Sequence, residues 1–330
     1  MDRRSFLKTL PLFCFSLAGS KLLVSCQSSP SSGLESLQFG ILSTEDEANQ
    51  KPLWEPFLAA MSQALGITVT PFYTDQYSNL IEAMRFEQIQ IAWYGGKAYV
   101  EAAQVAGAEA FALTLARDGS KGYYAHLIVR KDSPFIDQAK SLGGDRYVLE
   151  NATQLTFAFN DPNSTSGFLV PSYYIFAKNN LNPQKAFKKL HFAGNHEAAA
   201  LAVANGSVDI ATNNSEALVR LAKSYPDAYQ AIETIWTSVL IPGDPIAYHR
   251  NLPQPLKQKI QQFFYTYDDE AVLNPLDWSG FEAATDEDWN PVRELNIGKQ
   301  MLDIEANENI NPADKNKMLE ELQQKLDALS

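Results

Sequence analysis

Three consecutive hydroxyl side chains, Ser164-Thr165-Ser166, stand in a turn that could hold a small anion. The run Leu155–Phe159 before the turn is rich in aromatic and β-branched residues, which is typical of a buried strand. The apolar run after Gly167 is long enough for a helix. A strand-to-helix turn leaves several backbone N–H groups unpaired at the positive end of the helix dipole. With the three hydroxyl groups and the compact Gly167, these groups would form a receptacle for a tetrahedral oxyanion such as phosphate, sulfate or phosphonate.

The same turn has a simpler interpretation, because serine and threonine commonly cap helices. The local pattern favours this capping role over an anion site, and both interpretations stay open at this point. The turn contains no lysine and the chain has no GxxxxGK[ST] motif, so nucleotide binding of the P-loop type is not expected.

The chain is poor in residue patterns that break bonds at phosphorus or sulfur. Such an enzyme needs a metal, a base or a nucleophile. Ser164 is not part of a GxSxG motif, and no HxxxH, HExxH or Cys/His metal pattern includes any of the four histidines, His126, His191, His196 and His249. The sequence therefore predicts recognition rather than catalysis, without a cofactor or a metal ion.

The first 25 residues resemble an export signal rather than part of a fold. Arg3-Arg4 precedes a short apolar run, Thr9 to Leu17, which is too short to span a bilayer permanently. The run Leu23-Val24-Ser25-Cys26 resembles a lipobox, whose cysteine is lipidated and becomes the new N-terminus. We therefore expect a twin-arginine-like lipoprotein signal over 1–25, a lipidated tether over 26–36 and a membrane anchor at Cys26. An ordinary buried cysteine is the alternative for Cys26.

Composition and charge exclude several classes of partner. The chain has 330 residues, of which 45% are hydrophobic and 20% charged, enough for two packed domains. Its net charge is −12, and the signal holds four basic residues and one acidic residue, so the mature chain would carry about −15. This charge argues against nucleic acids and anionic membrane surfaces as partners. Any anion must therefore be held by local dipoles and hydrogen bonds.

Alternating strand-like and helix-like runs predict two α/β lobes. Three strand–helix pairs between residues 37 and 106 predict a parallel sheet with helices on both faces. We expect a first lobe over 37–130, a second lobe over 131–237, and a return to the first lobe with C-terminal helices over 238–330. The first crossing is expected at Ile128 to Ser133. Two crossings between two lobes imply a cleft with a hinge.

The C-terminus is expected to be an amphipathic helix that starts at Pro312 and is capped by Asn311. Such a helix can provide a surface for a partner. Packing on its own domain is the simpler interpretation, and the pattern favours it.

Several side chains are candidates for a ligand site because ligands of open α/β sheets bind beyond the carboxyl ends of the strands. Tyr94 and Glu216 each follow a predicted strand, as Ser164 does. Each candidate also has an ordinary structural role as an alternative: core packing for a tyrosine, a hydrophobic staple, a helix start or a turn. The further candidates are Tyr77, Tyr123, His196 and Asp244.

Several short strings together resemble the periplasmic phosphonate-binding proteins of ABC importers, the PhnD family. The most specific in combination are Asp161-Pro162-Asn163-Ser164-Thr165-Ser166-Gly167, Ile91-Ala92-Trp93-Tyr94-Gly95 and Leu240-Ile241-Pro242-Gly243-Asp244-Pro245. The resemblance covers roughly Leu37 to Phe264, and the part after about Asn274 does not contribute to it. It implies a type II periplasmic binding protein, an α/β fold of Venus-flytrap type with two lobes and two crossover segments.

The resemblance also assigns roles to the candidate residues. It places a phosphonate group at Ser164, Thr165 and Ser166, with Tyr123 and His196 nearby. It places the amine of 2-aminoethylphosphonate at the acidic residues Glu216 and Asp244. It also implies that Tyr77 and Tyr94 form the walls of the site. The turn before His196 is one residue longer than is usual in the family.

The function implied is a substrate-binding lipoprotein of a phosphonate ABC importer. We expect a monomer in the periplasm or on the cell surface, anchored through Cys26, which delivers its ligand to a membrane permease and breaks no bond. Three alternatives stay open: a binding protein for phosphite, phosphate or an alkylsulfonate, a lipid-anchored enzyme acting on phosphonates or phosphate esters, and a sensor for a membrane kinase.

Overall fold

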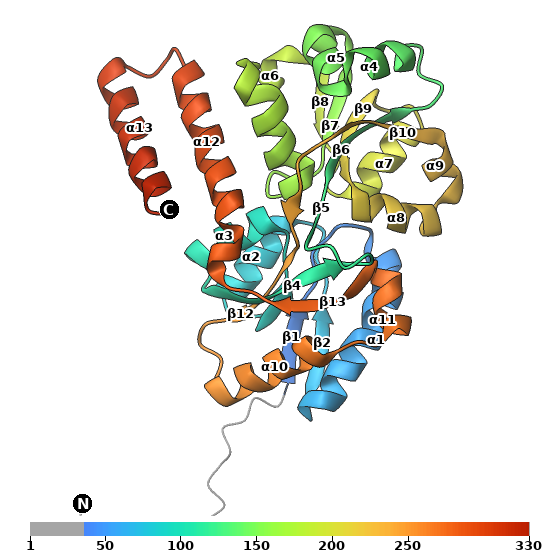
Figure 1. The fold of residues 1–330 in the computed structure, drawn as a ribbon, viewed down its shortest axis with the longest axis vertical. Coiled ribbons are helices and arrows are strands. Elements are labelled where there is room, and N and C mark those ends of the chain that lie inside the picture. The colour runs from blue at the N-terminus through green and yellow to red at the C-terminus, as the bar shows by residue number, and fades with distance from the viewer. Residues whose placement is uncertain (1–35, 330) are drawn as a thin grey trace, which may run out of the picture. The chain divides into compact units, whose positions relative to one another are not determined.

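The structure is a computed structural model that describes residues 36–329, in which two sheets are joined by a short ribbon (Figure 1). The predicted signal, the lipobox with Cys26 and nearly all of the tether lie outside the described residues. In the described part of the chain, no helix has both the length and the apolar character needed to cross a membrane.

The first lobe contains a six-stranded sheet in the order β13-β4-β12-β3-β1-β2. Its strands are β1 (Ser36–Gly40), β2 (Thr68–Phe72), β3 (Ile91–Trp93), β4 (Ala108–Ala116), β12 (Pro245–His249) and β13 (Trp278–Ala283). Its helical segments are α1 (Glu47–Leu65), α2 (Tyr77–Arg85), α3 (Gly96–Val105), α10 (Gln254–Thr266), α11 (Glu270–Leu273), η5 (Asn274–Leu276) and η6 (Asp286–Trp289).

This first sheet is mixed, so the expectation of a parallel sheet is correct only in part. β1 runs parallel to β2 and β3, whereas β12 is antiparallel to β3 and β4, and β13 is antiparallel to β4. Neither β4 nor β13 was predicted from the sequence. The alanine-rich run of β4 contains Thr114 as its single β-branched residue, and such residues favour strands; β13 lies in the part of the chain without a recognisable pattern.

The second lobe contains a five-stranded sheet in the order β10-β6-β9-β7-β8. Its strands are β6 (Ala125–Arg130), β7 (Thr156–Phe159), β8 (Lys189–Phe192), β9 (Ile210–Asn214) and β10 (Ile232–Thr237). Its helical segments are α4 (Ile136–Leu142), α5 (Gly144–Asn151), η1 (Ala152–Gln154), η2 (Thr165–Leu169), η3 (Ser172–Phe176), η4 (Ala177–Asn179), α6 (Pro183–Ala186), α7 (His196–Ala204), α8 (Ser215–Ser224) and α9 (Pro226–Ala231).

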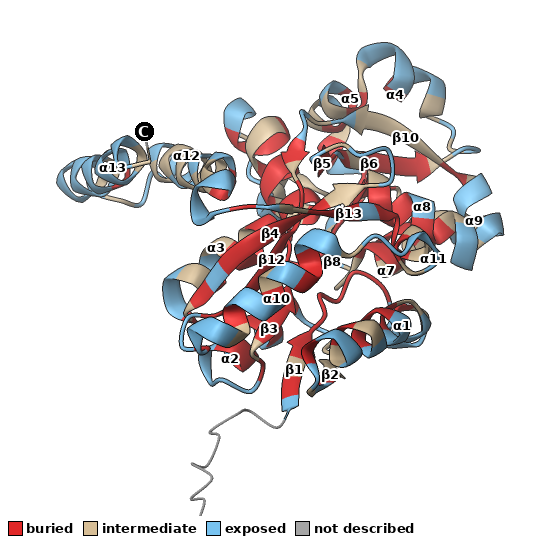
Figure 2. Cartoon of the chain, turned by 60° about the horizontal axis from the view of Figure 1, so that its bottom comes forward, coloured by how far each residue is buried: buried red, intermediate tan, exposed pale blue. Residues whose placement is uncertain are grey.

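Apolar clusters cover both faces of the second sheet, although β8, β9 and β10 also contain polar residues. Successive residues of a strand point to opposite faces. Accordingly, Leu127 and Val129 of β6 pack in one apolar cluster with Phe157, whereas Ile128 packs in another with Ala199 of α7. In Figure 2 the central strands of the first sheet, β1, β3, β4 and β12, are coloured mainly as buried, whereas β10 is mainly intermediate and long stretches of α10 and α13 are exposed.

The two lobes are connected through an antiparallel ribbon of β5 (Gly122–Tyr123) and β11 (Ile241–Pro242). The expected first crossing at Ile128 to Ser133 was placed too late. Residues 125–130 already pair with β9 and β10 inside the second sheet, so the chain changes sheets between β4 and β6. The extended segment from Gly122 to Arg130 forms two strands, which are separated at Tyr124.

The C-terminal segment is a pair of helices, α12 (Asn290–Ala306) and α13 (Pro312–Asp327). The Asn311 side chain accepts a hydrogen bond from the N–H of Asp314 at 2.9 Å, and Pro312 is in the first turn, which confirms the predicted cap. α13 packs against α12, and α12 in turn contacts α3 of the first lobe and η3 of the second. The last helix thus packs on α12 and is exposed over most of its length, so the expectation that it packs on its own domain is met only through α12.

Aromatic packing fixes the strands of the first lobe that lead to the cluster described below. Trp54 of α1 lies 5.4 Å from Phe39 of β1, 5.4 Å from Trp93 of β3 and 5.5 Å from Trp278 of β13, measured between ring centroids. Gly66, with φ of 71°, ends α1 as expected for a left-handed cap.

Candidate functional site

The hydroxyl-rich turn begins a helical segment and lies at the carboxyl end of β7. Ser164 precedes η2, and its Oγ accepts the N–H of Gly167 at 2.9 Å, so the capping role is confirmed for Ser164. The N–H groups of Thr165 and Ser166 are in the first turn, where no acceptor exists earlier in the helix. Capping by Ser164 therefore leaves two N–H groups directed beyond the helix end.

The three hydroxyl groups each accept a hydrogen bond from a different part of the molecule. Ser164 Oγ is bonded within its own turn, Thr165 Oγ1 accepts the N–H of Lys97 at 2.9 Å, and Ser166 Oγ lies 3.2 Å from the side-chain nitrogen of Asn214. A hydroxyl group that accepts an N–H still has its own proton to donate. All three residues are buried, so any ligand that reaches the turn would meet these hydroxyl groups in an enclosed site.

Gly167 allows this turn to pack tightly on β7 and β9. A Cβ atom at Gly167 would lie 2.5 Å from Oδ1 of Asn160. The hydroxyl of Thr212 donates to Asn160 Oδ1 at 2.6 Å and lies 2.7 Å from the carbonyl oxygen of Gly167. The turn is therefore fixed from below by two neighbouring strands.

His196 lies next to this turn as a neutral side chain. Its Nε2 is 3.2 Å from the side-chain nitrogen of Asn214, which also contacts Ser166. Burial lowers the pKa of His196 to about 3, and the charge of Arg220 contributes in the same direction. Because Nε2 faces an N–H donor, we assign the proton to Nδ1, which is buried without a partner among the described residues. Nδ1–H is thus a further donor beside the hydroxyl groups.

Tyr77 and Tyr123 bring two phenol groups to the same place. The Tyr77 hydroxyl lies against Ser164, and the Tyr123 hydroxyl lies against Thr165 and the carboxyl group of Asp244. Burial raises the pKa of both phenols well above the usual value, with a further increase from Asp244. Both hydroxyl groups therefore keep their protons at neutral pH.

Glu216 brings a buried carboxyl group to the cluster from α8. The side chain of Asn214 accepts the N–H of Ala217 at 2.7 Å and caps this helix, and Glu216 is only 6% exposed. Burial raises the pKa of Glu216 to about 7; the positive charge of Arg220 opposes the increase, and the negative charge of Asp277 adds to it.

Asp244 provides a second buried carboxyl group, from the segment between β11 and β12. It is 5% exposed, and its backbone N–H donates to Thr114 Oγ1 at 3.1 Å. Burial raises the pKa of Asp244 well above the usual range, the negative charge of Glu216 adds to the increase, and a hydrogen bond from Tyr123 opposes it. Oδ1 of Asp244 is buried without a hydrogen-bond partner in the described structure.

Tyr94 is the one predicted site residue that the structure does not bring to this cluster. Its side chain is fully buried in the core of the first lobe, and its hydroxyl donates to the carbonyl oxygen of Leu80 at 3.3 Å. The neighbouring residue Trp93 reaches the cluster in place of Tyr94, since its side chain lies close enough to Asp244 to lower the pKa of that carboxyl group. The successive residues of β3 point to opposite faces, so the sequence alone did not decide which of the two faces the site.

Glu45, Lys97 and Arg220 belong to the surroundings of the site and were missed. Glu45 follows β1 and pairs with Arg220 of α8 at 2.7 Å. Lys97 Nζ donates to Asn163 Oδ1 at 3.0 Å, beside the hydroxyl-rich turn. Glu45 follows a strand, Lys97 lies at the start of a helix and Arg220 lies one turn after Glu216, so these positions could have indicated the site. The residue types, however, are those of ordinary surface charges.

Contacts between the lobes enclose the cluster. The carbonyl oxygen of Thr44 in the first lobe accepts the N–H groups of His196 and Glu197 at the start of α7. Asn49 of α1 donates to Glu197 Oε2 at 2.8 Å. The first turns of α7 and η2 are thus both in contact with the first lobe, and water is largely excluded from the groups between them.

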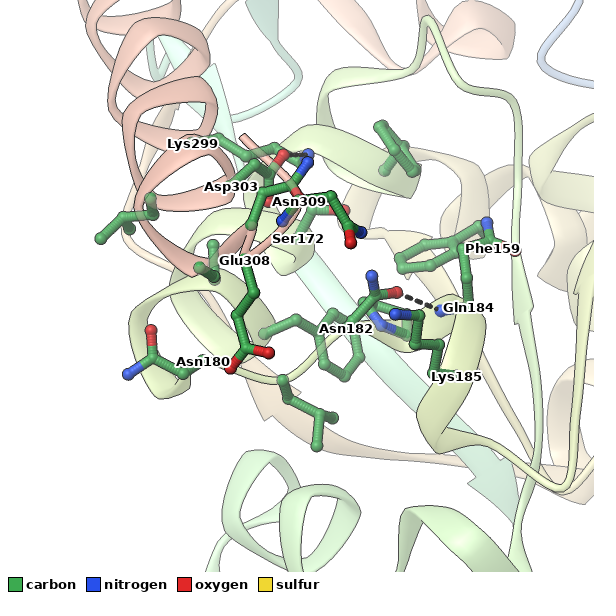
Figure 3. A pocket seen from close by; sticks show the side chains of 18 residues that line it. Phe159, Ser172, Asn180, Asn182, Gln184, Lys185, Lys299, Asp303, Glu308 and Asn309 are labelled. Atoms are coloured by element: carbon green, nitrogen blue, oxygen red, sulfur yellow. Dashed lines mark hydrogen bonds and ion pairs between the residues drawn. The ribbon is translucent and has the colours of Figure 1, made fainter. Parts of the chain in front are cut away.

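Two further observations concern metal binding and an open pocket away from the cluster. Among the described residues, no group of three or more His, Cys, Asp or Glu side chains is arranged to hold a metal ion. An open pocket of about 860 Å³ between α6, η3 and α12 (Figure 3) contains none of the predicted site residues. It is lined by Lys185, Asp303 and Asn309, among others.

Two lobes with two crossing segments and an enclosed polar cluster define a type II periplasmic binding protein. A family model described as "ABC transporter, phosphonate, periplasmic substrate-binding protein" matches residues 39–289, so the chain belongs to this family. The chain is 45% identical over 299 residues to the phosphonates-binding periplasmic protein of Escherichia coli, covering 89% of this chain and 86% of that protein.

Solved structures agree with this assignment. A binding protein of an ABC phosphonate transporter from Pseudomonas aeruginosa has 43% sequence identity and a TM-score of 0.84, covering 89% of this chain and 96% of that one. A protein from Prochlorococcus marinus solved in complex with methylphosphonate has 19% identity and a TM-score of 0.70, covering 79% and 97%, and it shares the fold. The relatives in these comparisons are transport proteins, and the family is periplasmic.

Replacing Gly167 with alanine is expected to weaken the binding of every phosphonate by at least about tenfold. The new Cβ would collide with Asn160, which cannot move without breaking its bond to Thr212. Calorimetric titration would measure the loss. Gly95→Ala is the matched control, because a Cβ there would lie 3.6 Å from Thr165 Oγ1, an ordinary contact. Equal affinities for the two variants would contradict the tight packing of the turn.

The pKa of Glu216 gives a prediction for stability without ligand. A folded-state pKa of about 7, above the unfolded value of about 4.5, means that the native state holds the proton longer. The stability contributed by this proton is present below pH 4.5 and is lost as pH rises through 7, by at most about 1.4 kcal/mol per pH unit. Urea unfolding at several pH values should show a shallower decline for Glu216→Gln. The same decline in both proteins would show that Glu216 titrates normally.

Proposed function

We propose that the protein binds an organophosphonate that carries an amine, best represented by 2-aminoethylphosphonate, between its two lobes. It then delivers this ligand to the permease of an ABC importer. The membership of the phosphonate-binding family supports the phosphonate end of this ligand. The amine end rests on the side chains of this chain.

The anion end of the proposed site is the turn at Ser164, Thr165 and Ser166. Three hydroxyl groups, two backbone N–H groups and Nδ1–H of His196 can donate to the phosphonate oxygens. Each of these donors is neutral, so the site does not need a positive side chain in the turn. Neutral donors also suit a protein whose net charge is negative, because they hold the anion by hydrogen bonds at short range and do not depend on the overall charge of the protein.

The observation that carries the amine end is the pair of buried carboxyl groups, Glu216 and Asp244. Each raises the cost of ionising the other, and Asp244 Oδ1 has no protein partner among the described residues. A ligand ammonium group between them would stabilise both ionised forms. Phosphite or methylphosphonate would leave the carboxyl groups without a positive partner in an enclosed site, which is unfavourable. Tyr77 and Tyr123 would line the ligand, and Tyr94 would support them from the core.

The proposed action is a cycle of closure and release without chemistry on the ligand. The ribbon of β5 and β11 would serve as the hinge, and closure would present a new surface to the permease. We further propose that the protein acts as a monomer in the periplasm or at the cell surface, held to the membrane by a lipid on Cys26. The tether after Cys26 would give the lobes freedom to reach the permease.

Isothermal titration calorimetry on the chain produced without Cys26 tests the ligand. We expect a dissociation constant of about 1 μM or tighter for 2-aminoethylphosphonate, and much weaker binding of methylphosphonate, phosphite and phosphate. Phosphite or phosphate as the best ligand would keep the anion end and reject the amine end. Absence of binding by all four would reject both, and turnover of a phosphonate would show an enzyme.

The same titrations with Glu216→Gln separate the two ends of the site. Affinity for 2-aminoethylphosphonate is expected to fall at least about tenfold, whereas affinity for methylphosphonate stays within about threefold. Glu197→Gln is the control, since Glu197 is a second buried glutamate that bonds to Asn49 outside the cluster. Equal losses for both ligands in Glu216→Gln would reject the role assigned to its charge.

A further inference from the structure

A buried ion pair joins the two lobes beside the proposed amine end. Nε of Arg220 donates to Oε1 of Glu45 at 2.7 Å, and the two side chains are only 5% and 8% exposed. Arg220 belongs to α8 of the second lobe, whereas Glu45 lies in the first lobe, in the loop between β1 and α1. Because the partners come from different lobes, a movement that separates the lobes would break this pair.

The same face of α8 makes further contacts with the first lobe. Nη1 of Arg220 lies 3.5 Å from the carbonyl oxygen of Leu276, and Lys223 Nζ donates to the carbonyl oxygen of Asn274 at 3.1 Å. In Figure 1, α8 lies on the side of the second lobe that faces α11. Closure therefore brings the charged face of α8 onto the first lobe.

A second acidic residue, Glu216, lies near Arg220 on the same helix. Arg220 follows Glu216 by four residues, the spacing at which an acidic and a basic side chain pair on one helix face. The charge of Arg220 already favours the ionised form of Glu216, so the two groups lie within electrostatic reach. Glu45 and Glu216 thus compete for one guanidinium group, and in this closed arrangement the hydrogen bond goes to Glu45.

Glu45 is held in place for this role. The hydroxyl of Thr44 donates to Glu45 Oε2 at 2.6 Å, and Gln50 lies 3.2 Å from the same hydroxyl and 2.6 Å from the carbonyl oxygen of Leu42. These contacts of Thr44 and Gln50 lie within the first lobe, whereas the bonds from α7 to the carbonyl oxygen of Thr44 join the two lobes. The carboxylate therefore stands ready at the position that Arg220 reaches on closure.

We propose that Glu45 is a specificity-determining residue: it withdraws Arg220 from Glu216 when the lobes close, and so leaves the charge of Glu216 to the amine of the ligand. This inference rests on the proposed function. With the lobes open, Arg220 is free to pair with Glu216 along α8. Closure then exchanges one positive partner of Glu216, the guanidinium, for another, the ligand ammonium. Glu45 itself need not touch the ligand.

Glu45→Gln in the full chain tests this exchange. The amide removes the negative charge that holds Arg220, so Arg220 is expected to neutralise Glu216 in the closed form as well. By calorimetry, affinity for 2-aminoethylphosphonate should fall at least about tenfold, and affinity for methylphosphonate by no more than about threefold. The measured quantity is the ratio of the two affinities, because a contact that only favours closure changes both ligands by the same factor.

A second variant and a control make the test specific. Glu45→Gln combined with Arg220→Gln removes both charges of the pair and leaves Glu216 unpaired, so the ratio is expected to recover toward the wild-type value. Asn49→Ala removes another contact between the lobes, its bond to Glu197, and should weaken both ligands equally. If Glu45→Gln does not unfold cooperatively, Glu45→Asp replaces it, since the shorter carboxylate holds Arg220 less closely and should lower the ratio by a smaller factor.

The outcomes separate this inference from the function on which it rests. Equal losses for both ligands in Glu45→Gln, an unchanged ratio in Glu45→Asp, or no recovery in the double variant would overturn the role of Glu45 while the wild-type preference stands. A wild-type protein without preference for 2-aminoethylphosphonate would overturn the proposed function, and this inference with it.

Discussion

Two carboxyl groups, Glu216 and Asp244, are buried together in a part of the molecule from which water is largely excluded. Burying carboxylates without a positive partner is costly, and each negative charge increases the cost for the other. Only one guanidinium, that of Arg220, acts on both among the described residues, and its hydrogen bond goes to Glu45. The positively charged ligand that we propose would resolve this constraint, and closure of the lobes and the nature of the ligand would then be parts of one electrostatic problem.

The fold brings these groups together from distant parts of the chain. β1 and β3 lead to Glu45 and Trp93, the segment after β11 carries Asp244, and α8 carries Glu216. The proposed anion end lies at the helix start after β7, where dipoles and hydroxyl groups would replace charged side chains. In the proposed function, an acidic protein would hold an anion at one end of a small site and a cation at the other.

The sequence predicted local features well. The helix start at Ser164 and the cap at Asn311 depend on a few neighbouring residues, so their patterns are informative. The order of strands and the burial of Tyr94 depend on packing between distant segments. The pair of Glu45 with Arg220 spans 175 residues, and no local pattern distinguishes such a pair from two surface charges. The resemblance to a family supplied the residues of the site, whereas the structure supplied the electrostatic relation between them.

A crystal structure of the complex with 2-aminoethylphosphonate would test the central claim most directly. The account predicts the phosphonate group at the N–H and hydroxyl groups of residues 164–166, and the amine within hydrogen-bond distance of both Glu216 and Asp244, about 3 Å. Arg220 should remain on Glu45 in that structure. An amine directed away from the two carboxyl groups, or a phosphonate group bound elsewhere, would contradict the account.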